Sequence, residues 1–150
     1  FTSFDKHIHE KYFYAMQRIG EYTFSKYKVA WKYIASEFTT CVISSKKDMY
    51  LGNKNLIPNE KIIFIPFENK TEAYFVCGFL SSTVIRNLIN SFISRIQISP
   101  STIENIKIPD FDKNNKYHLK ISELCEIGHN KENKKEILKK IDFYIKYLDN

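Results

Sequence analysis

The stretch YTFSKYKVAWKYI, residues Tyr22–Ile34, decides how the first half of the chain folds. Side chains alternate between the two faces of a strand, so this stretch divides into an apolar set and a basic set. The apolar set is Tyr27, Val29, Trp31 and Tyr33, and the basic set is Lys26, Lys28 and Lys32. We expect the apolar set to face the core of a sheet and the lysines to face solvent or a polyanion.

Two more runs are predicted to extend this strand into a sheet. FTTCVI at Phe38–Ile43 is rich in β-branched residues and follows the turn-like segment IASE, which predicts a pair of antiparallel strands. The polar stretch 44–58 contains glycine, asparagine and proline and is typical of a loop. KIIFIPF at Lys61–Phe67 is continuously apolar, which predicts a buried strand. Because Pro66 has no N–H to donate, that strand should end there or lie at an edge.

The middle of the chain is predicted to be helical. Asn69 followed by Glu72 has the form of a helix start, and the next segment, EAYFVCGFL, is apolar on all sides and should be buried. The segment SST then restarts a second helix. The apolar face of that second helix is Val84, Ile85, Leu88, Ile89, Phe92 and Ile93. Ser99 and Pro100 fit the start of a short helical turn, and NIKIP at residues 105–109 is predicted to be a brief strand.

The C-terminal part is predicted to hold two amphipathic helices. The first begins in the Asp- and Asn-rich part of DFDKNNKYHLKISELCEIG and stops at Gly128. The stripe of the second, spaced like a helix seam, is Ile137, Ile141, Tyr144 and Leu148. Strands in the first half and helices in the second make the predicted fold class α+β. We expect residues 1–129 to form one domain, and residues 130–150 to be a helix of that domain or the start of a linker helix.

Composition indicates a globular protein, and its charge makes a polyanion the first partner to consider without deciding the matter. A chain of 150 residues fits one domain, and its formal net charge of +6 favours nucleic acid, then an anionic membrane surface or an acidic protein. Cys41, Cys77 and Cys125 are too widely spaced for a zinc knuckle or a disulfide framework, which favours reduced thiols and a cytoplasmic location. We expect no membrane span, and the start at Phe1 suggests a piece of a longer polypeptide.

The sequence offers little catalytic chemistry. Its four glycines are isolated, so no glycine-rich turn that could hold a nucleotide cofactor can be written. His7 and His9 lack a third ligand, and we expect no metal site. Asp110 and Asp112 in PDFDK superficially resemble the acidic core of a metal-dependent nuclease, but carboxylates are also favoured at a helix start. Capping is the favoured interpretation, with a nuclease as the alternative, and we assign no catalytic residue.

Basic and amide side chains interleaved with aromatics suggest a phosphate-binding surface. The candidate DNA-binding residues, chosen by charge and position, are Lys26, Lys28, Lys32, Lys46, Lys47, Asn53, Lys54 and Arg95. The alternative is a sheet with one solvated face, on which lysines discourage edge pairing. The residues alone favour neither interpretation.

Several blocks, taken in order, resemble one known family. The blocks are YAMQRIGEYTFSKYKVAWK, NLIPNEKIIFIPF, EAYFVCGFLSSTVIRNLINSF, ISPSTIENIKIPDFD and HLKISELCEIGH. They resemble the target recognition region of type IIG and TaqI-like adenine-specific DNA methyltransferases of restriction–modification systems. The resemblance spans most of residues 12–129, with LSS where the family typically has LNS.

This resemblance implies a TaqI-like specificity domain that recognises a double-stranded DNA sequence. Catalysis and S-adenosylmethionine binding would then belong to a separate methyltransferase domain of the same polypeptide, since the family's Pro-Pro-aromatic motif has no counterpart here. The parent would be an adenine-N6 methyltransferase, with or without endonuclease activity. The alternative is a protein-interaction or specificity-subunit module of a multi-chain restriction system, which associates through the helix in residues 130–150.

Overall fold

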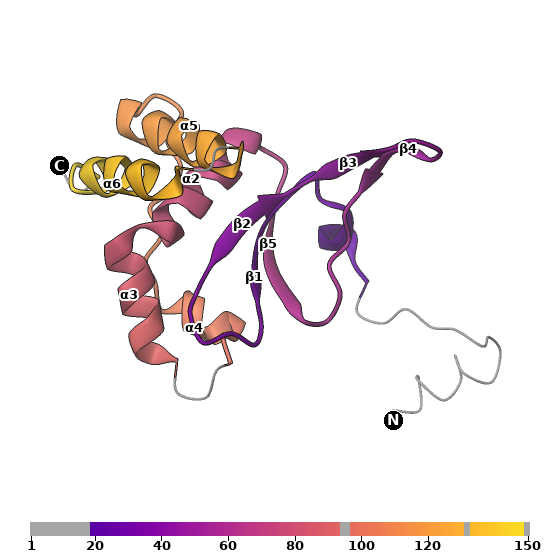
Figure 1. Cartoon of the computed structure of the whole chain (residues 1–150), viewed down its shortest axis with the longest axis horizontal. Helices are drawn as coiled ribbons and strands as arrows, with labels where there is room; N and C mark the ends of the chain where they lie inside the picture. The colour runs from indigo at the N-terminus through magenta and orange to yellow at the C-terminus, as the bar shows by residue number, and fades with distance from the viewer. Residues whose placement is uncertain (1–18, 94–96, 131–132, 149–150) are drawn as a thin grey trace.

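The computed structural model describes residues 19–93, 97–130 and 133–148. A small antiparallel sheet lies against a helical part, and a β-hairpin projects from the sheet on the side away from the helices (Figure 1). The strands precede the helices along the chain, so the α+β prediction is confirmed. Among the described residues, no helix has the length and apolar character needed to cross a membrane.

The sheet has three strands in the order β2-β1-β5, and both pairings are antiparallel. Its strands are β1 (Tyr27–Lys32), β2 (Thr40–Ile43) and β5 (Ile62–Phe67). The predicted pairing of the first two strands is therefore confirmed, with Val29 opposite Val42. Pro66 lies in an edge strand, also as expected, although β5 is half-buried rather than buried.

The central strand departs from the simple alternation of the sequence. Four consecutive residues, Lys28–Trp31, are buried, because both faces of β1 are covered. On one face Trp31 enters the main core and donates from Nε1 to the carbonyl of Ile98 at 3.0 Å. On the other face, the short 3-10 helix η1 (Glu21–Phe24) places Tyr22 against Phe64, with ring centroids 6.0 Å apart.

The polar stretch 44–58, predicted to be a loop, instead contains a β-hairpin. Its strands are β3 (Ser45–Asp48) and β4 (Gly52–Asn55), which pair only with each other. The sequence gives no strand signal here because every residue of both strands is exposed, so no apolar alternation is needed.

The helical part is built around a buried helix, α2 (Lys70–Ser81), as predicted. The Asn69 side chain caps it by accepting from the N–H of Thr71 at 2.9 Å. Helix α5 (Lys116–Asn130) packs along α2 and continues past Gly128, so the predicted stop there is wrong. A glycine inside a helix costs only about 1 kcal/mol, which packing of the last turn can outweigh.

Two shorter elements connect these helices. Helix α3 (Thr83–Phe92) and helix α4 (Pro100–Glu104) begin where the sequence predicts, but residues 105–109 are not a strand. Of the expected apolar face of α3, only Ile89 is fully buried, while Val84 and Phe92 are exposed.

The last helix, α6 (Lys134–Ile145), turns its seam towards the chain's own core. Ile137 and Ile141 are buried there, and Tyr144 and Leu148 pack against the same cluster. The Asp142 carboxylate accepts from the N–H and hydroxyl of Thr83 at 2.7 and 2.6 Å, which ties α6 to the first residue of α3. In this structure the seam is therefore not free to dock a partner helix.

Candidate nucleic-acid interface

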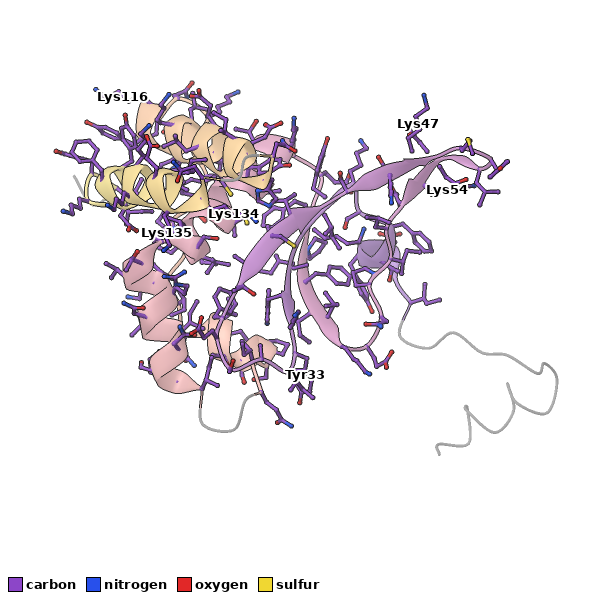
Figure 2. All side chains as sticks on the ribbon, in the orientation of Figure 1. Tyr33, Lys47, Lys54, Lys116, Lys134 and Lys135 are labelled. Atoms are coloured by element: carbon purple, nitrogen blue, oxygen red, sulfur yellow. The ribbon has the colours of Figure 1, made fainter. Side chains whose placement is uncertain are left out.

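The projecting hairpin brings together four of the eight candidate DNA-binding residues. Lys46, Lys47, Asn53 and Lys54 all belong to β3 or β4 and are exposed. Figure 2 shows Lys47 and Lys54 on this hairpin, away from the body of the molecule. The sequence places these residues near one another only as members of one loop, whereas the hairpin fixes them in a two-stranded register.

The register sets two lysines directly opposite each other. Lys46 faces Lys54, and Lys47 faces Asn53. Like charges in opposite positions of an antiparallel pair are mutually destabilising, and an anion between or beside them relieves the repulsion. Within the described part of the chain, none of these three lysines forms an ion pair with a carboxylate. Their positive charge is therefore available to a polyanion.

The turn of the hairpin has a defined conformation despite its exposure. The Asp48 carboxylate accepts from the N–H groups of Tyr50 and Leu51 at 2.9 and 2.8 Å, and Gly52 adopts a φ of 70°. The same two hydrogen bonds lower the pKa of Asp48. This carboxylate is thus used to form the turn, next to the lysines.

The base of the hairpin is attached to the body. The Asn55 amide donates to the carbonyl of Phe24 at 3.1 Å, and the N–H of Leu56 donates to the carbonyl of Ser44 at 3.3 Å. These bonds connect the arm to η1 and close the strand pair, so the arm is held at its root while its far end stays in solvent.

Of the four remaining candidates, Lys26 and Lys32 are exposed and Lys28 is buried. Lys32 is exposed at the end of β1. Lys26 is exposed and forms a surface ion pair with Glu68 at 3.6 Å, an arrangement that contributes little stability and leaves the ammonium accessible. Arg95 lies outside the described residues, as do His7 and His9.

Lys28 is the exception, because the expectation that it faces solvent or DNA is wrong. Its side chain is 1% exposed, and its Nζ donates to the carbonyl of Ser25 at 2.7 Å. The same Nζ lies 5.8 Å from the centre of the Phe64 ring. Burial lowers the pKa of Lys28, partly offset by the nearby Glu68. A phosphate has no access to this ammonium group in the structure.

Two cations that were not selected from the sequence, Arg86 and Lys134, line a cavity beside β2. Arg86, Cys41, His129 and Lys134 are among the residues that line this space of about 450 Å³. Lys134 and Lys135 lie in the first turn of α6 (Figure 2). From the sequence alone, the two lysines look like residues on the solvated face of an amphipathic helix. Arg86 looks like a residue that helix packing engages.

The histidine of this cavity is already engaged with the backbone. His129 Nε2 accepts from the N–H of Val42 at 2.9 Å, and Nδ1 donates to the carbonyl of Cys125 at 2.8 Å. This pattern needs a neutral tautomer, so the ring joins α5 to β2 with both of its nitrogens engaged by the backbone. Of the three free thiols, Cys77 and Cys125 are buried and Cys41 is exposed.

The described residues present no catalytic constellation. No group of three or more His, Cys, Asp or Glu side chains among them converges to hold a metal. The Asp112 carboxylate accepts from the N–H of Asn114 at 2.8 Å, and Asn115 accepts from the N–H of Tyr117 at 2.9 Å. Asn115 thus caps the start of α5, whereas Asp112 forms the turn that precedes the helix. The capping role expected of the acids in PDFDK is therefore taken by Asn115 in the described contacts.

Comparison with known proteins gives one informative similarity. The chain is 34% identical over 91 residues to the type II methyltransferase M.MjaIV of Methanocaldococcus jannaschii. The match covers 58% of this chain but only 30% of that protein, so the chain spans less than a third of its relative's length. No family model and no solved structure matches the chain. The similarity relates this chain to a type II methyltransferase.

Proposed function

We propose that this chain binds double-stranded DNA as the target recognition domain of a restriction–modification adenine-N6 DNA methyltransferase, of the type IIG or TaqI-like kind. The observation that carries the proposal is the exposed hairpin, on which three lysines without acidic partners surround a fixed turn. The similarity to a type II methyltransferase supports the kind of parent enzyme.

The proposed contact surface is the hairpin, with the exposed Lys26 just before β1 and the exposed Lys32 at the far end of β1 as further candidates. The proposed residues are Lys26, Lys32, Lys46, Lys47, Asn53 and Lys54. Ammonium groups bind phosphates and release counterions, whereas an amide such as that of Asn53 can also read a base edge. Lys28 is removed from this surface by its burial. Arg95 stays a prediction.

Methyl transfer is proposed to occur elsewhere in a longer polypeptide. Among the glycines of the described part, Gly52 has a positive φ, and it lies in an exposed turn. We propose that S-adenosylmethionine binds the separate catalytic domain. We therefore assign no catalytic step to this chain. The catalytic partner domain would extrude and methylate the adenine, while this domain holds the duplex; we place the parent enzyme in the cytoplasm.

The test is duplex binding by two variants with the same change in charge. One variant replaces Lys46, Lys47 and Lys54 with glutamine, and the control replaces the exposed Lys113, Lys139 and Lys146. With a 30-bp duplex at low salt, we expect the hairpin variant to lose about tenfold or more in affinity and the control less than about threefold, because only the first removes phosphate contacts. Equal losses would reject the hairpin as the interface, and no binding by the unmodified chain would reject the function.

A further inference from the structure

We propose that the β3–β4 hairpin enters the major groove with its turn first, and that Tyr50, flanked by Met49 and Leu51, contacts the bases while the lysines hold phosphates. This inference rests on the proposed function and goes beyond it by assigning sequence preference to the apolar turn and affinity to the basic strands.

The dimensions of the hairpin fit one groove and not the other. Two paired strands lie about 4.8 Å apart, and their side chains widen the ribbon further. The major groove of B-DNA is about 12 Å wide and admits a two-stranded ribbon, whereas the minor groove is about 6 Å wide. Because β3 and β4 pair only with each other, the ribbon meets the groove without a third strand beside it.

The turn exposes large apolar side chains that the fold does not use. Met49, Tyr50 and Leu51 are 83%, 86% and 67% exposed. None belongs to the hydrophobic core of the described residues. Such side chains are costly to leave in water, and at a DNA surface they can contact the thymine methyl group or stack on bases.

The turn is also ordered in advance of binding. The two hydrogen bonds to Asp48 and the positive φ of Gly52 hold the backbone that carries Tyr50. A loop that already has its bound conformation loses less entropy on association, which favours a recognition role over a flexible tether.

The charges around the turn select nucleic acid as the occupant. Lys46, Lys47 and Lys54 lie within a few residues of Tyr50 along the two strands, on both faces of the ribbon. The hairpin's one carboxylate, that of Asp48, is bonded inside the turn. An apolar tip between cationic strands matches stacked bases between two phosphate backbones.

The test separates base contacts from phosphate contacts. The 150-residue chain is used to select duplexes from a pool with a randomised central segment, alongside Tyr50→Ser and the control Phe143→Ser. The control alters a half-exposed aromatic on α6, away from the hairpin. We expect the unmodified chain and the control to enrich the same sequences. Tyr50→Ser should bind the unselected pool with the same salt dependence as the unmodified chain. Its preference for the enriched sequences over the unselected pool should fall by about tenfold or more, because the change removes a base contact and no charge.

The outcomes distinguish this inference from the proposed function. If the unmodified chain binds the pool but enriches nothing, or if Tyr50→Ser enriches the same sequences as strongly, the turn does not read bases and the inference is overturned while DNA binding stands. If the unmodified chain does not bind the pool, the proposed function fails. The thermal unfolding midpoint of Tyr50→Ser should equal that of the unmodified chain, since the side chain is exposed.

Groove choice has a separate readout. Methyl green occupies the major groove and netropsin the minor groove, so each is titrated against a complex of the chain with a 30-bp duplex. We expect methyl green to displace the chain and netropsin to leave it bound. Displacement by netropsin alone would place the hairpin in the minor groove and overturn the proposal.

Discussion

The ammonium group of Lys28 is held between a backbone carbonyl and an aromatic ring instead of reaching solvent. The hydrogen bond to Ser25 and the ring of Phe64 compensate only part of the cost of burying this charge, because no carboxylate contacts the ammonium group within the described residues. Removing a buried charge of this kind is often neutral or stabilising when the replacement fills the same volume.

We therefore expect Lys28→Met to change the free energy of unfolding by less than about 1 kcal/mol and to leave DNA affinity unchanged. Urea denaturation and duplex binding measure the two quantities. Lys32→Met on the same strand is the comparison, since Lys32 is exposed and within the proposed contact surface. A drop in DNA affinity for Lys28→Met as large as that for Lys32→Met would place Lys28 at the interface after all.

His118 gives the fold a dependence on pH. Its ring stacks on Phe75 with centroids 4.3 Å apart, and Nδ1 accepts from the N–H of Asp112 at 3.0 Å. Both arrangements suit the neutral ring, and burial lowers the pKa of His118 from its ordinary value. His118 therefore binds a proton more readily in the unfolded chain than in the native one. Its contribution to stability is fully present above pH 6.5 and is lost as the pH falls towards the native pKa.

We expect the free energy of unfolding to decrease from pH 7 to pH 5, with a slope of up to about 1.4 kcal/mol per pH unit from this one group. His118→Phe keeps the stacking but cannot titrate, and its slope over this range should be smaller. Denaturation at several pH values measures the difference. Identical slopes for the two proteins would mean that His118 has the same pKa in both states.

Among the elements, helices α2 and α5 pack closely at Gly78. A Cβ atom at this position would lie 2.7 Å from Cγ2 of Ile121 and 3.3 Å from its carbonyl oxygen. Gly128 lies in α5, and a Cβ atom there would have its nearest neighbour, Cγ2 of Ile137, at 3.4 Å.

The two glycines should therefore respond in opposite ways to alanine. We expect Gly78→Ala to destabilise the fold by about 1–3 kcal/mol through overpacking. Gly128→Ala should be neutral or stabilise by up to about 1 kcal/mol, because alanine has the higher helix propensity. Urea denaturation of both variants gives the comparison, and a tolerated Gly78→Ala would contradict the close packing of these helices.

Helix α6 is expected to contribute to the stability of the fold through its buried seam. Ile141 is 2% exposed, so Ile141→Ala should cost about 2–5 kcal/mol. The control Lys139→Ala, at an exposed position, should cost less than about 0.5 kcal/mol. If α6 were a linker helix that packs elsewhere, both variants would unfold like the unmodified chain.

The elements that were predictable from the sequence are those whose residues carry their own signal. Helix α2 combines a cap at Asn69 with a continuous apolar run, and α6 has an apolar stripe at helical spacing. The hairpin β3–β4 was predicted as a loop because its side chains meet only solvent. The end of α5 was misplaced because packing, which is not visible in local sequence, outweighs the cost of Gly128.

At the scale of the whole molecule, the candidate site was predictable in its composition but not in its arrangement. The sequence selected the lysines and the asparagine that the hairpin brings together, and it could not distinguish Lys28 from them, because burial of both faces of β1 depends on η1 and α2. Arg86 and Lys134 meet at one cavity only because the fold brings α3, α6 and β2 to its border. Residues that are brought together in this way leave no pattern in the local sequence.

The dependence of DNA affinity on salt shows whether the hairpin lysines neutralise phosphates. Each neutralised phosphate changes the slope of log Kobs against log salt by about −0.9. For the unmodified chain and a 30-bp duplex, the three hairpin contacts contribute about −3 to this slope, so the slope should be weaker by about 3 in the variant that replaces Lys46, Lys47 and Lys54. A slope near zero for the unmodified chain, or a slope that the variant leaves unchanged, would contradict phosphate binding by the hairpin.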